Sequence, residues 1–546
     1  MMKKRISFAL LLCLLAVAYA PACTNLIVGK KASADGSTIV SYSADSYGLF
    51  GELYHYPAGV HAPGTMLKVY EWDTGKFLGE IEQAPRTYNV AGNMNEHQLT
   101  IAETTFGGRP ELADSTGILD YGSLIYIALQ RSRTAREAID VMTSLVQRYG
   151  YYSGGESFTL ADPNEVWIME MIGKGPGVKG AVWVAVRVPD DCIAAHANQA
   201  RIHKFDMNDP ANCLYSPDVI SFAREKGYFD GANKDFSFAK AYAPLDFGAR
   251  RFCEARVWSF FNRYTDQGEA FLPYIQGDSD EPMPLFIRPS RKLSVQDVKA
   301  MMRDHYEGTP LDISNDFGAG VHKMPYRLSP LTFKVDGKEY FNERPISTQQ
   351  SGWVFVAQMR ADKPNAIGGV LWFGLDDANM TVFTPIYGCI TRAPECYTRV
   401  DGADYITFSW NSSFWIYNWV ANMIYPRYDV MIGDMRAVQQ GLEAGYESRQ
   451  AEVEAEAARL LEKDPAAAVE YLTKYCEESA WKAHNAWKDL GMFLIVKYND
   501  GVEKRVKDGR FERNSIGQPA TVKRPGYSPE FLQEYVRQTG DRYRVK

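Results

Sequence analysis

The stretch that decides the fold is CTNLIVGKKASADGSTIVSYSAD, residues 23–45. Two β-prone runs, LIV and TIV, flank the turn sequence ADGS at 34–37. Asp-Gly between two such runs is a strong signal for an antiparallel hairpin. Folding the chain about this turn returns Asp45 to within a residue or two of Cys23 on the neighbouring strand. The sequence therefore predicts a carboxylate beside the thiol of Cys23.

Residues 1–22 form a segment of a different kind. A basic start, MMKKR, precedes an almost wholly apolar run and then small residues, a pattern typical of a secretory signal peptide. Cleavage after Ala20 is disfavoured because a proline follows directly, whereas cleavage after Ala22 leaves Cys23 as the first residue of the mature chain. The sequence therefore predicts a secreted or periplasmic protein that begins with a cysteine.

A lipid anchor on Cys23 is the weaker alternative. A lipoprotein signal normally has leucine three residues before the cysteine and a small residue next, but these places hold Ala20 and Pro21. The sequence after Cys23 is also strand-forming rather than a flexible polar tether. No stretch outside the signal offers about 18 uninterrupted apolar residues, so we expect no membrane span.

Composition and charge narrow the choice of partners and cofactors. Loss of the signal leaves 57 basic against 67 acidic residues, a net charge of −10, with no long basic run. Nucleic acid and anionic membrane are therefore not expected as partners. The eight histidines form no HExxH pattern, and there is no Cys-x-x-Cys, GxGxxG or P-loop sequence. We expect no metal and no other cofactor; the formation of a homo-oligomer and the disulfide connectivity stay open.

A cysteine at the amino terminus carries a nucleophile and a base on one residue. A free α-amine has a pKa of about 8, close to the pH at which a general base works best. The amine of Cys23 can accept the thiol proton directly or through one water, while Asp45 holds the amine in position. The simpler interpretation is that Asp45 only caps a loop.

Four segments in order resemble one family. CTNLIVGKKASADGSTIVSYSADS resembles the opening of the cysteine-type dipeptidases of the N-terminal-nucleophile (Ntn) hydrolase superfamily, which are relatives of penicillin V acylase and bile salt hydrolase. The resemblance continues at 91–108, 136–173 and 183–202, and a weaker similarity follows at 372–388. It implies an α+β fold, a four-layer αββα sandwich, and hydrolysis of the amide bond of dipeptides.

The resemblance also implies roles for individual residues. Cys23 matches the nucleophile, Asp45 the carboxylate that binds its amine, and Asn198 a candidate oxyanion donor. The family's arginine comes from GARRFCEARVWSFFN (248–262), where Arg256 fits the pattern better than Arg251. Taken without the resemblance, Asn198 reads equally as a turn residue and Arg256 as a solvated helix residue.

The chain departs from the family at two places. Tyr42 stands where many relatives carry an arginine, which puts activation of the thiol from that side in doubt. Thr105 stands where the acylases supply a second oxyanion asparagine, so its backbone N–H or hydroxyl is the candidate donor. Glu103 is near this motif in sequence and is a candidate to pair with the ammonium group of a dipeptide substrate.

Further along the chain, local patterns predict helices and strands. A capping-box pattern at 134–137 opens a helix, a hairpin spans 157–169, and a strand follows at 182–186. Two long helices are expected at 435–463 and 466–490, and an extended tail from Gly509. We therefore divide the chain into a signal peptide (1–22), an Ntn-type catalytic domain (23–428), and a helical extension with a tail (429–546).

The function that the sequence favours is a dipeptidase that works through a thioester on Cys23. An alternative within the same chemistry is an amidase or acylase that acts on bile-acid or acyl-amine conjugates. Two other classes are a non-catalytic binding lipoprotein and a papain-type enzyme that pairs an internal cysteine with a histidine.

Overall fold

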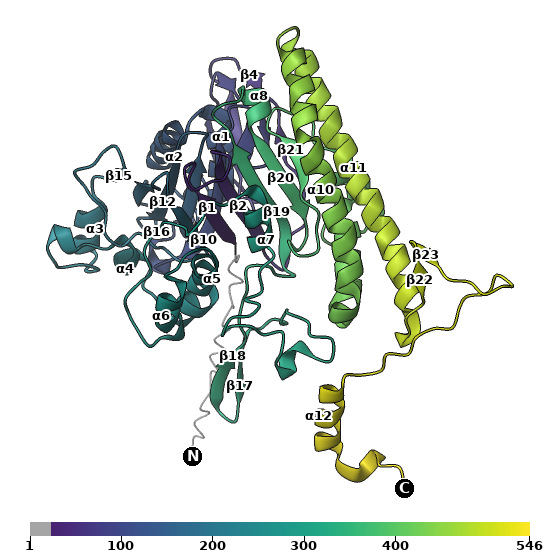
Figure 1. Ribbon diagram of the computed structural model, residues 1–546. Coiled ribbons are helices and arrows are strands. Elements are labelled where there is room, and N and C mark those ends of the chain that lie inside the picture. Colours follow the sequence, from purple (N-terminus) through teal and green to yellow (C-terminus); the bar gives the residue numbers. More distant parts are fainter. Residues whose placement is uncertain (1–22) are drawn as a thin grey trace, which may run out of the picture.

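The computed structural model describes residues 23–546, so the predicted signal peptide lies outside the described residues. Two antiparallel sheets occupy the centre of the molecule (Figure 1). The first sheet has seven strands, in the spatial order β16 (Phe286–Ile287), β14 (Ile193–His196), β1 (Thr24–Val28), β2 (Thr38–Asp45), β19 (Ser351–Met359), β20 (Val370–Leu375) and β21 (Thr384–Tyr387).

The second sheet is built mainly from the segment that follows the first hairpin. Its eight strands have the spatial order β15 (Cys213–Tyr215), β13 (Ala181–Arg187), β12 (Val166–Gly173), β11 (Gly155–Ala161), β10 (Thr100–Gly107), β9 (Met94–Asn95), β8 (Val90–Ala91) and β3 (His55–Tyr56). The hairpin predicted at 157–169 is β11 and β12, and the strand predicted at 182–186 is β13. Both predictions are confirmed.

The hairpin predicted around Asp35 is confirmed as β1 and β2. The strands pair antiparallel with Thr24 opposite Ser43, so Cys23 falls next to the end of β2. The connection is a loop at 29–37 rather than a two-residue turn, and the midpoint of the ladder lies ahead of Asp-Gly, between Ser33 and Ala34. Asp35 instead organises the loop by accepting hydrogen bonds from the hydroxyls of Ser33 and Ser37.

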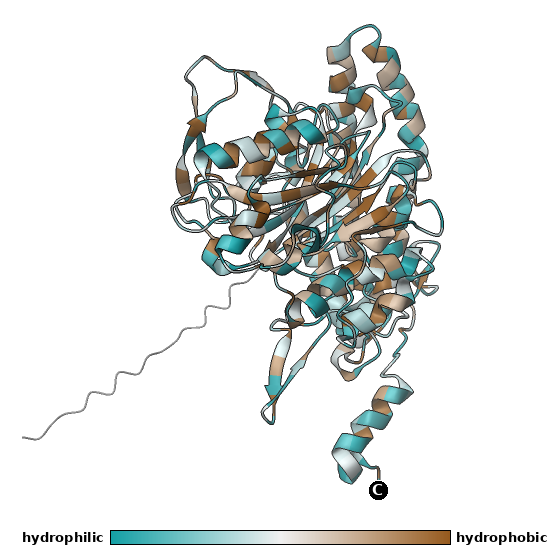
Figure 2. Ribbon diagram, turned by 90° about the vertical axis from the view of Figure 1, so that its left-hand side faces the viewer, coloured by the Kyte–Doolittle hydropathy of each residue, from teal (hydrophilic) through white to brown (hydrophobic). Residues whose placement is uncertain are grey.

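The two sheets pack on each other through β1, β2 and β10. Every residue of β1 and β2 is buried, as expected for strands covered on both faces. Helices α1 (Tyr121–Arg131) and α2 (Ala135–Tyr149) pack on the second sheet, while α5 (Ala255–Tyr264) and α7 (Val295–Met301) pack on the first. Figure 2 shows the central strands mostly apolar and the outer helices partly hydrophilic.

The predicted helix start at 134–137 is confirmed in part. The side chain of Thr134 accepts from the backbone N–H of Glu137, as a capping residue does. The Glu137 carboxylate accepts from the backbone of Arg133 instead of Thr134, so the reciprocal half of the box is displaced by one residue.

Two long antiparallel helices form the C-terminal region, as predicted. α10 (Tyr428–Leu461) and α11 (Pro465–Tyr498) pack on each other, and both lie against β21 at the edge of the first sheet (Figure 1). The remaining helices are shorter: α3 (Val219–Glu225), α4 (Phe238–Tyr242), α6 (Leu272–Gln276), α8 (Asn365–Gly368) and α9 (Ser413–Ile424). The prediction of a mixed α and β fold with a helical C-terminal region is confirmed.

The prediction of an extended tail from Gly509 is wrong for one segment. Residues Pro529–Thr539 form helix α12. None of its side chains is buried. Ser528 caps this helix and Pro529 occupies its first turn, where the missing N–H costs nothing. Four two-stranded ribbons complete the structure: β4 (Gly59–Val60) with β7 (Arg86–Thr87), β5 (Met66–Tyr70) with β6 (Phe77–Glu82), β17 (Thr332–Val335) with β18 (Lys338–Phe341), and β22 (Val506–Lys507) with β23 (Arg510–Phe511).

From residue 23 onward, no helix combines the length and apolar character needed to cross a bilayer. The seven cysteines of this part of the chain are all free thiols.

Candidate active site

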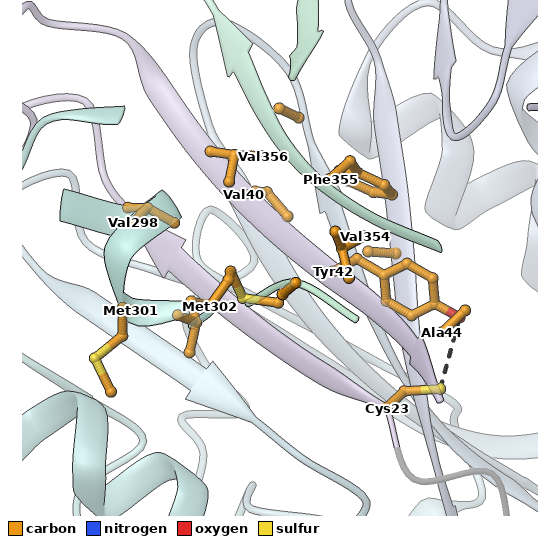
Figure 3. Packing of buried hydrophobic residues seen from close by; sticks show 14 of the residues in the cluster. Cys23, Val40, Tyr42, Ala44, Val298, Met301, Met302, Val354, Phe355 and Val356 are labelled. Atoms are coloured by element: carbon orange, nitrogen blue, oxygen red, sulfur yellow. Dashed lines mark hydrogen bonds between the residues drawn. The ribbon is translucent and has the colours of Figure 1, made fainter. Parts of the chain in front are cut away.

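Cys23 lies directly before β1, at the end of the central strand pair, and is 2% exposed. Its Sγ is 3.6 Å from the hydroxyl of Tyr42 (Figure 3) and 3.6 Å from Oε1 of Glu103. Burial raises the pKa of the Cys23 thiol well above its ordinary value, and the charges of Glu103 and Asp45 raise it further. The thiol therefore needs a base or an added positive charge before it can act as a nucleophile.

Asp45 ends β2 and is fully buried, with protein donors on both carboxylate oxygens. The hydroxyl of Ser351 donates to Oδ1 at 2.6 Å. Arg344 donates to Oδ2 at 2.6 Å, and the hydroxyl of Ser43 donates to the same oxygen at 3.0 Å. These donors compensate a buried negative charge and hold the carboxylate beside Cys23. Its predicted role toward the amine of Cys23 stays a prediction.

Arg256, on α5, is the arginine that reaches Cys23. Its Nη1 donates to the carbonyl of Cys23 at 2.5 Å and to the hydroxyl of Thr24 at 2.8 Å. Burial lowers the pKa of Arg256 to about 10, with a further contribution from the charge of Arg344, so the side chain stays cationic at neutral pH. Arg251, the less well matched candidate, forms an ion pair with Glu343.

Asn198 is held in a fixed orientation just after β14. Its backbone has a φ of 63°, in the left-handed region that asparagine tolerates better than most residues. Its Oδ1 accepts from Nη2 of Arg256 at 2.9 Å, and its Nδ2 donates to the carbonyl of Thr105 at 2.8 Å. The amide nitrogen therefore points toward the backbone of β10.

The hydroxyl of Thr105 is hydrogen-bonded to Glu156, and the role of Thr105 as an oxyanion donor, through its backbone N–H, stays a prediction. The hydroxyl donates to Oε1 of Glu156 at 2.6 Å. A hydroxyl has one hydrogen to donate, so this contact directs it away from an oxyanion. Thr105 therefore contributes to the site by positioning Glu156 and, through its carbonyl, Asn198.

Glu103 and Glu156 form a buried pair of carboxyl groups next to the thiol. The hydroxyl of Tyr42 donates to Oε1 of Glu103 at 2.6 Å. Burial raises the pKa of Glu103 to about 7. The pKa of Glu156 is also raised, mainly by burial and then by the charge of Glu103. Tyr42, at the place of the family's arginine, thus supplies a hydroxyl to a carboxyl group rather than a positive charge.

A cavity of about 170 Å³ reaches the site at Asn198. Asn198, Phe106 and Cys253 are among the residues that line it. At about 30 Å³ per water molecule, it has room for roughly five or six waters. It is therefore large enough to admit part of a small substrate.

The structure thus gathers the residues predicted from sequence and adds three that were missed. The predicted residues lie within one connected set of contacts: Cys23, Asp45, Glu103, Thr105, Asn198 and Arg256. Sequence reasoning missed Arg344, in the loop before β19, and Ser351, the first residue of β19, because no local signal marks either as a partner of Asp45. It also missed Glu156, although two acidic residues on strands that pair were a usable signal.

Histidine chemistry has no support from the geometry. Across residues 23–546, no cysteine forms a hydrogen bond with a histidine, and no cluster of metal-binding side chains is present. His196 is fully buried between the hydroxyls of Thr104 and Thr159, and burial lowers its pKa to about 3. A papain-type site would need a histidine beside its thiol.

Comparison with known proteins identifies the family. Residues 22–441 match the family model of Peptidase family C69. A "Probable dipeptidase" of Salmonella dublin is 27% identical over 410 residues, which cover 71% of this chain and 85% of that protein. "Dipeptidase A" of Lactobacillus helveticus is 24% identical over 419 residues, which cover 72% of this chain and 80% of that protein.

The chain belongs to peptidase family C69, a family of cysteine peptidases. The expectation of a cysteine-type peptidase is therefore confirmed, and so is the resemblance from which it came. The family match ends inside α10, so most of the helical hairpin and all of α12 lie beyond it.

Proposed function

We propose that this protein is an exported dipeptidase that hydrolyses the amide bond of dipeptides through a thioester on Cys23. One observation carries the proposal: Cys23 lies where the ends of β1 and β2, the Arg256 guanidinium and the Asn198 amide meet. The dipeptidase names of relatives in the same family support the substrate class.

The first half of the reaction forms the thioester. Removal of residues 1–22 gives Cys23 a free α-amine, which takes the thiol proton while Asp45 holds the amine in place. The sulfur attacks the peptide carbonyl, an S–C bond forms, and the Nδ2 of Asn198 stabilises the negative oxygen. The ammonium group of Cys23 returns the proton to the leaving nitrogen as the C–N bond breaks.

The second half hydrolyses the thioester. Water attacks the thioester carbonyl and gives one proton to the Cys23 amine, and the C–S bond breaks when that proton reaches the sulfur. Arg256 acts through its contacts with the Cys23 carbonyl and with Asn198, so it positions the nucleophile and the oxyanion donor together. No group outside the chain is needed for the protons to balance.

The proposal includes the four-layer αββα sandwich of the Ntn hydrolases. The packing of β1 and β2 on β10 supports two central sheets, and the helices on the far side of each sheet support two outer layers. The proposal also includes export to the periplasm or the medium, supported by the signal-like sequence of residues 1–22. Sequencing the amino terminus of the exported protein tests both the cleavage site and the location.

Two other functions are less well supported. A lipid-anchored binding protein would need an accessible Cys23, whereas this side chain is 2% exposed. An acylase for bile-acid or acyl-amine conjugates would place an uncharged chain next to the nucleophile, where Glu103 and Glu156 lie buried. Both observations favour the dipeptidase.

The decisive experiment compares two proteins, one that begins at Cys23 and one that carries two extra residues before it. We expect the first to hydrolyse a panel of dipeptides and the second to retain under about 1% of that rate, because its nitrogen is in a peptide bond and is no base. Equal thermal unfolding of the two proteins controls for misfolding. Equal turnover would refute the proposal.

A further inference from the structure

Two acidic side chains meet beside the nucleophile on neighbouring strands. Glu103 is on β10 and Glu156 is on β11, opposite Thr105 in the antiparallel pairing, so the two carboxyl groups lie diagonally on one face. Glu103 is 2% exposed and Glu156 is fully buried. Oε1 of Glu103 accepts from Tyr42 and lies 3.6 Å from the Cys23 sulfur.

This pair has acceptor capacity that no donor in the described part of the chain uses. Within residues 23–546, Oε2 of Glu103 and Oε2 of Glu156 have no hydrogen-bond donor, and neither glutamate belongs to an ion pair. Burying a carboxylate without a partner is costly, so chains normally supply one. Asp45, just across the thiol, has three such donors.

The covalent geometry of a dipeptide brings a positive charge to this place. The ammonium nitrogen is two bonds from the attacked carbonyl carbon, about 2.5 Å away. A reacting sulfur lies about 3–3.5 Å from that carbon, so the ammonium nitrogen lies within about 6 Å of Sγ. A charge-assisted hydrogen bond of about 2.8 Å to Oε1 of Glu103 falls inside this range, because that oxygen is 3.6 Å from Sγ.

We infer that Glu103 and Glu156 together bind the α-ammonium group of the substrate and restrict hydrolysis to the first peptide bond of a free amino terminus. The inference rests on the proposed function, since it assigns the substrate specificity of the same site. It adds Glu156 to the site and distinguishes a dipeptide from every N-acylated amide, whose nitrogen carries no charge.

The bound cation also changes the protonation of the pair. Burial raises the pKa of both carboxyl groups, and the charge of Glu103 raises that of Glu156 further, so the pair retains a proton when no cation is bound. An ammonium group displaces that proton and offsets the negative charge that opposes the Cys23 thiolate. The titratable groups that face the pair, from every packed element, are Cys23, Tyr42, Asp73, Tyr121 and Tyr151.

The test compares the best substrate of a dipeptide panel with its desamino analogue, in which hydrogen replaces the ammonium group. We expect the enzyme to prefer the dipeptide by at least about 100-fold in kcat/KM. Glu156→Gln and Glu103→Gln should each lower kcat/KM for the dipeptide by about 10- to 100-fold, mainly through KM, the range of a charged hydrogen bond. In each variant the preference for the dipeptide over the desamino analogue should fall by about 10-fold or more, because any effect on the thiol is common to both substrates and cancels in the ratio.

Glu165→Gln is the matched control. Glu165 lies at the other end of the β11–β12 hairpin, where it pairs with Arg187, so the same chemical change should leave both rates and their ratio unaltered. An unchanged dipeptide preference in Glu103→Gln and Glu156→Gln would overturn the inference. Hydrolysis of both substrates alike by the unaltered enzyme would also overturn it, while leaving the proposed function standing.

A binding measurement separates the inference from catalysis. Calorimetric titration of the Cys23→Ala protein, begun at residue 23, should show at least about 10-fold tighter binding of the dipeptide than of the desamino analogue. Repeating the titration at pH 6.5 in two buffers of different ionisation enthalpy should show proton release, which Glu103→Gln reduces. Equal affinities would reject the inference; ammonium-dependent binding without hydrolysis by the Cys23 enzyme would reject only the proposed function.

Discussion

The two flanks of Cys23 differ in how completely their buried charges are compensated. On the β2 flank, Asp45 receives three hydrogen bonds, one of them from Arg344. On the β10 flank, Glu103 and Glu156 each keep one carboxyl oxygen without a donor among residues 23–546. Both flanks are buried, so solvent exposure does not explain the difference.

The difference separates the framework of the site from its binding surface. A compensated buried charge contributes to a fixed geometry, and removing one partner leaves the other unpaired. A buried charge without a partner destabilises the fold, and a ligand of opposite charge can relieve that destabilisation. We therefore expect substitutions on the β2 flank to change stability and kcat, and those on the β10 flank to change KM and pH dependence.

The largest effect should come from the atom between the two flanks. Cys23→Ala should lower kcat by at least about 10⁴-fold, since it removes the nucleophile that is proposed to form a covalent bond with the substrate. Initial rates on a dipeptide measure it. Cys192→Ala, which removes another buried free thiol, should keep the full rate. A Cys23→Ala enzyme with more than a few per cent of the original rate would contradict the assignment.

Breaking the compensated flank should cost stability. Asp45→Asn leaves Arg344 buried without its anion, and breaking a buried ion pair in this way costs about 3–5 kcal/mol. Urea denaturation measures the change. Ser43→Ala removes only one hydrogen bond to the same carboxylate and should cost about 1 kcal/mol. Equal losses in the two variants would mean that the ion pair adds nothing to the framework.

Asn198, whose side chain is held by Arg256 and by the carbonyl of Thr105, tests whether a fixed donor acts on kcat. Asn198→Ala removes an amide that Arg256 orients, and loss of one oxyanion donor lowers kcat by about 10²–10³-fold. KM should change by less than about 3-fold. The kinetic constants of a purified, folded variant settle the matter: a raised KM with an unchanged kcat would make Asn198 a binding residue.

The smallest effect should be a pH dependence of stability from the acidic flank. The folded pKa of Glu103, about 7, lies above its ordinary value of 4.5, so the folded chain keeps a proton that the unfolded chain has lost. This contribution is fully present below pH 4.5 and is lost as the pH rises through 7. Glu103→Gln should reduce the fall in unfolding free energy between pH 5.5 and 8 by about 1–3 kcal/mol, at about 1.4 kcal/mol per pKa unit.

Urea denaturation at the two pH values makes this measurement, and Glu165→Gln again serves as the control. Glu165 lies on a turn and pairs with Arg187, so its variant should keep the original pH slope. A Glu103→Gln slope equal to that of the unaltered protein would show that Glu103 ionises normally.

The parts of the fold that follow from local patterns were predicted from sequence. The β1–β2 hairpin placed Asp45 near Cys23, and helical periodicity located α10 and α11. Arg344 could not be found in this way, because it meets Asp45 from 299 residues further along the chain. Such a contact depends on β19 pairing with β2, which no local signal specifies.

Two further differences have local physical causes. Prolines suggested an extended tail, but Pro529 follows the capping residue Ser528 and so begins α12 rather than preventing it. Because position 42 holds tyrosine instead of arginine, the sequence did not show which group lies beside the thiol. The structure shows the Tyr42 hydroxyl donating a hydrogen bond to Glu103. Side chains that meet across sheets are the part that sequence patterns describe least.

The contrast between the two ends of the described chain has a practical consequence. Cys23 is buried at the end of the central strand pair of the first sheet, whereas α12 lies apart from both sheets and contributes no buried residue (Figure 1). Affinity tags, fluorophores and surface-coupling groups therefore belong after Lys546, where they leave the core untouched. The same additions in front of Cys23 would be expected to inactivate the preparation.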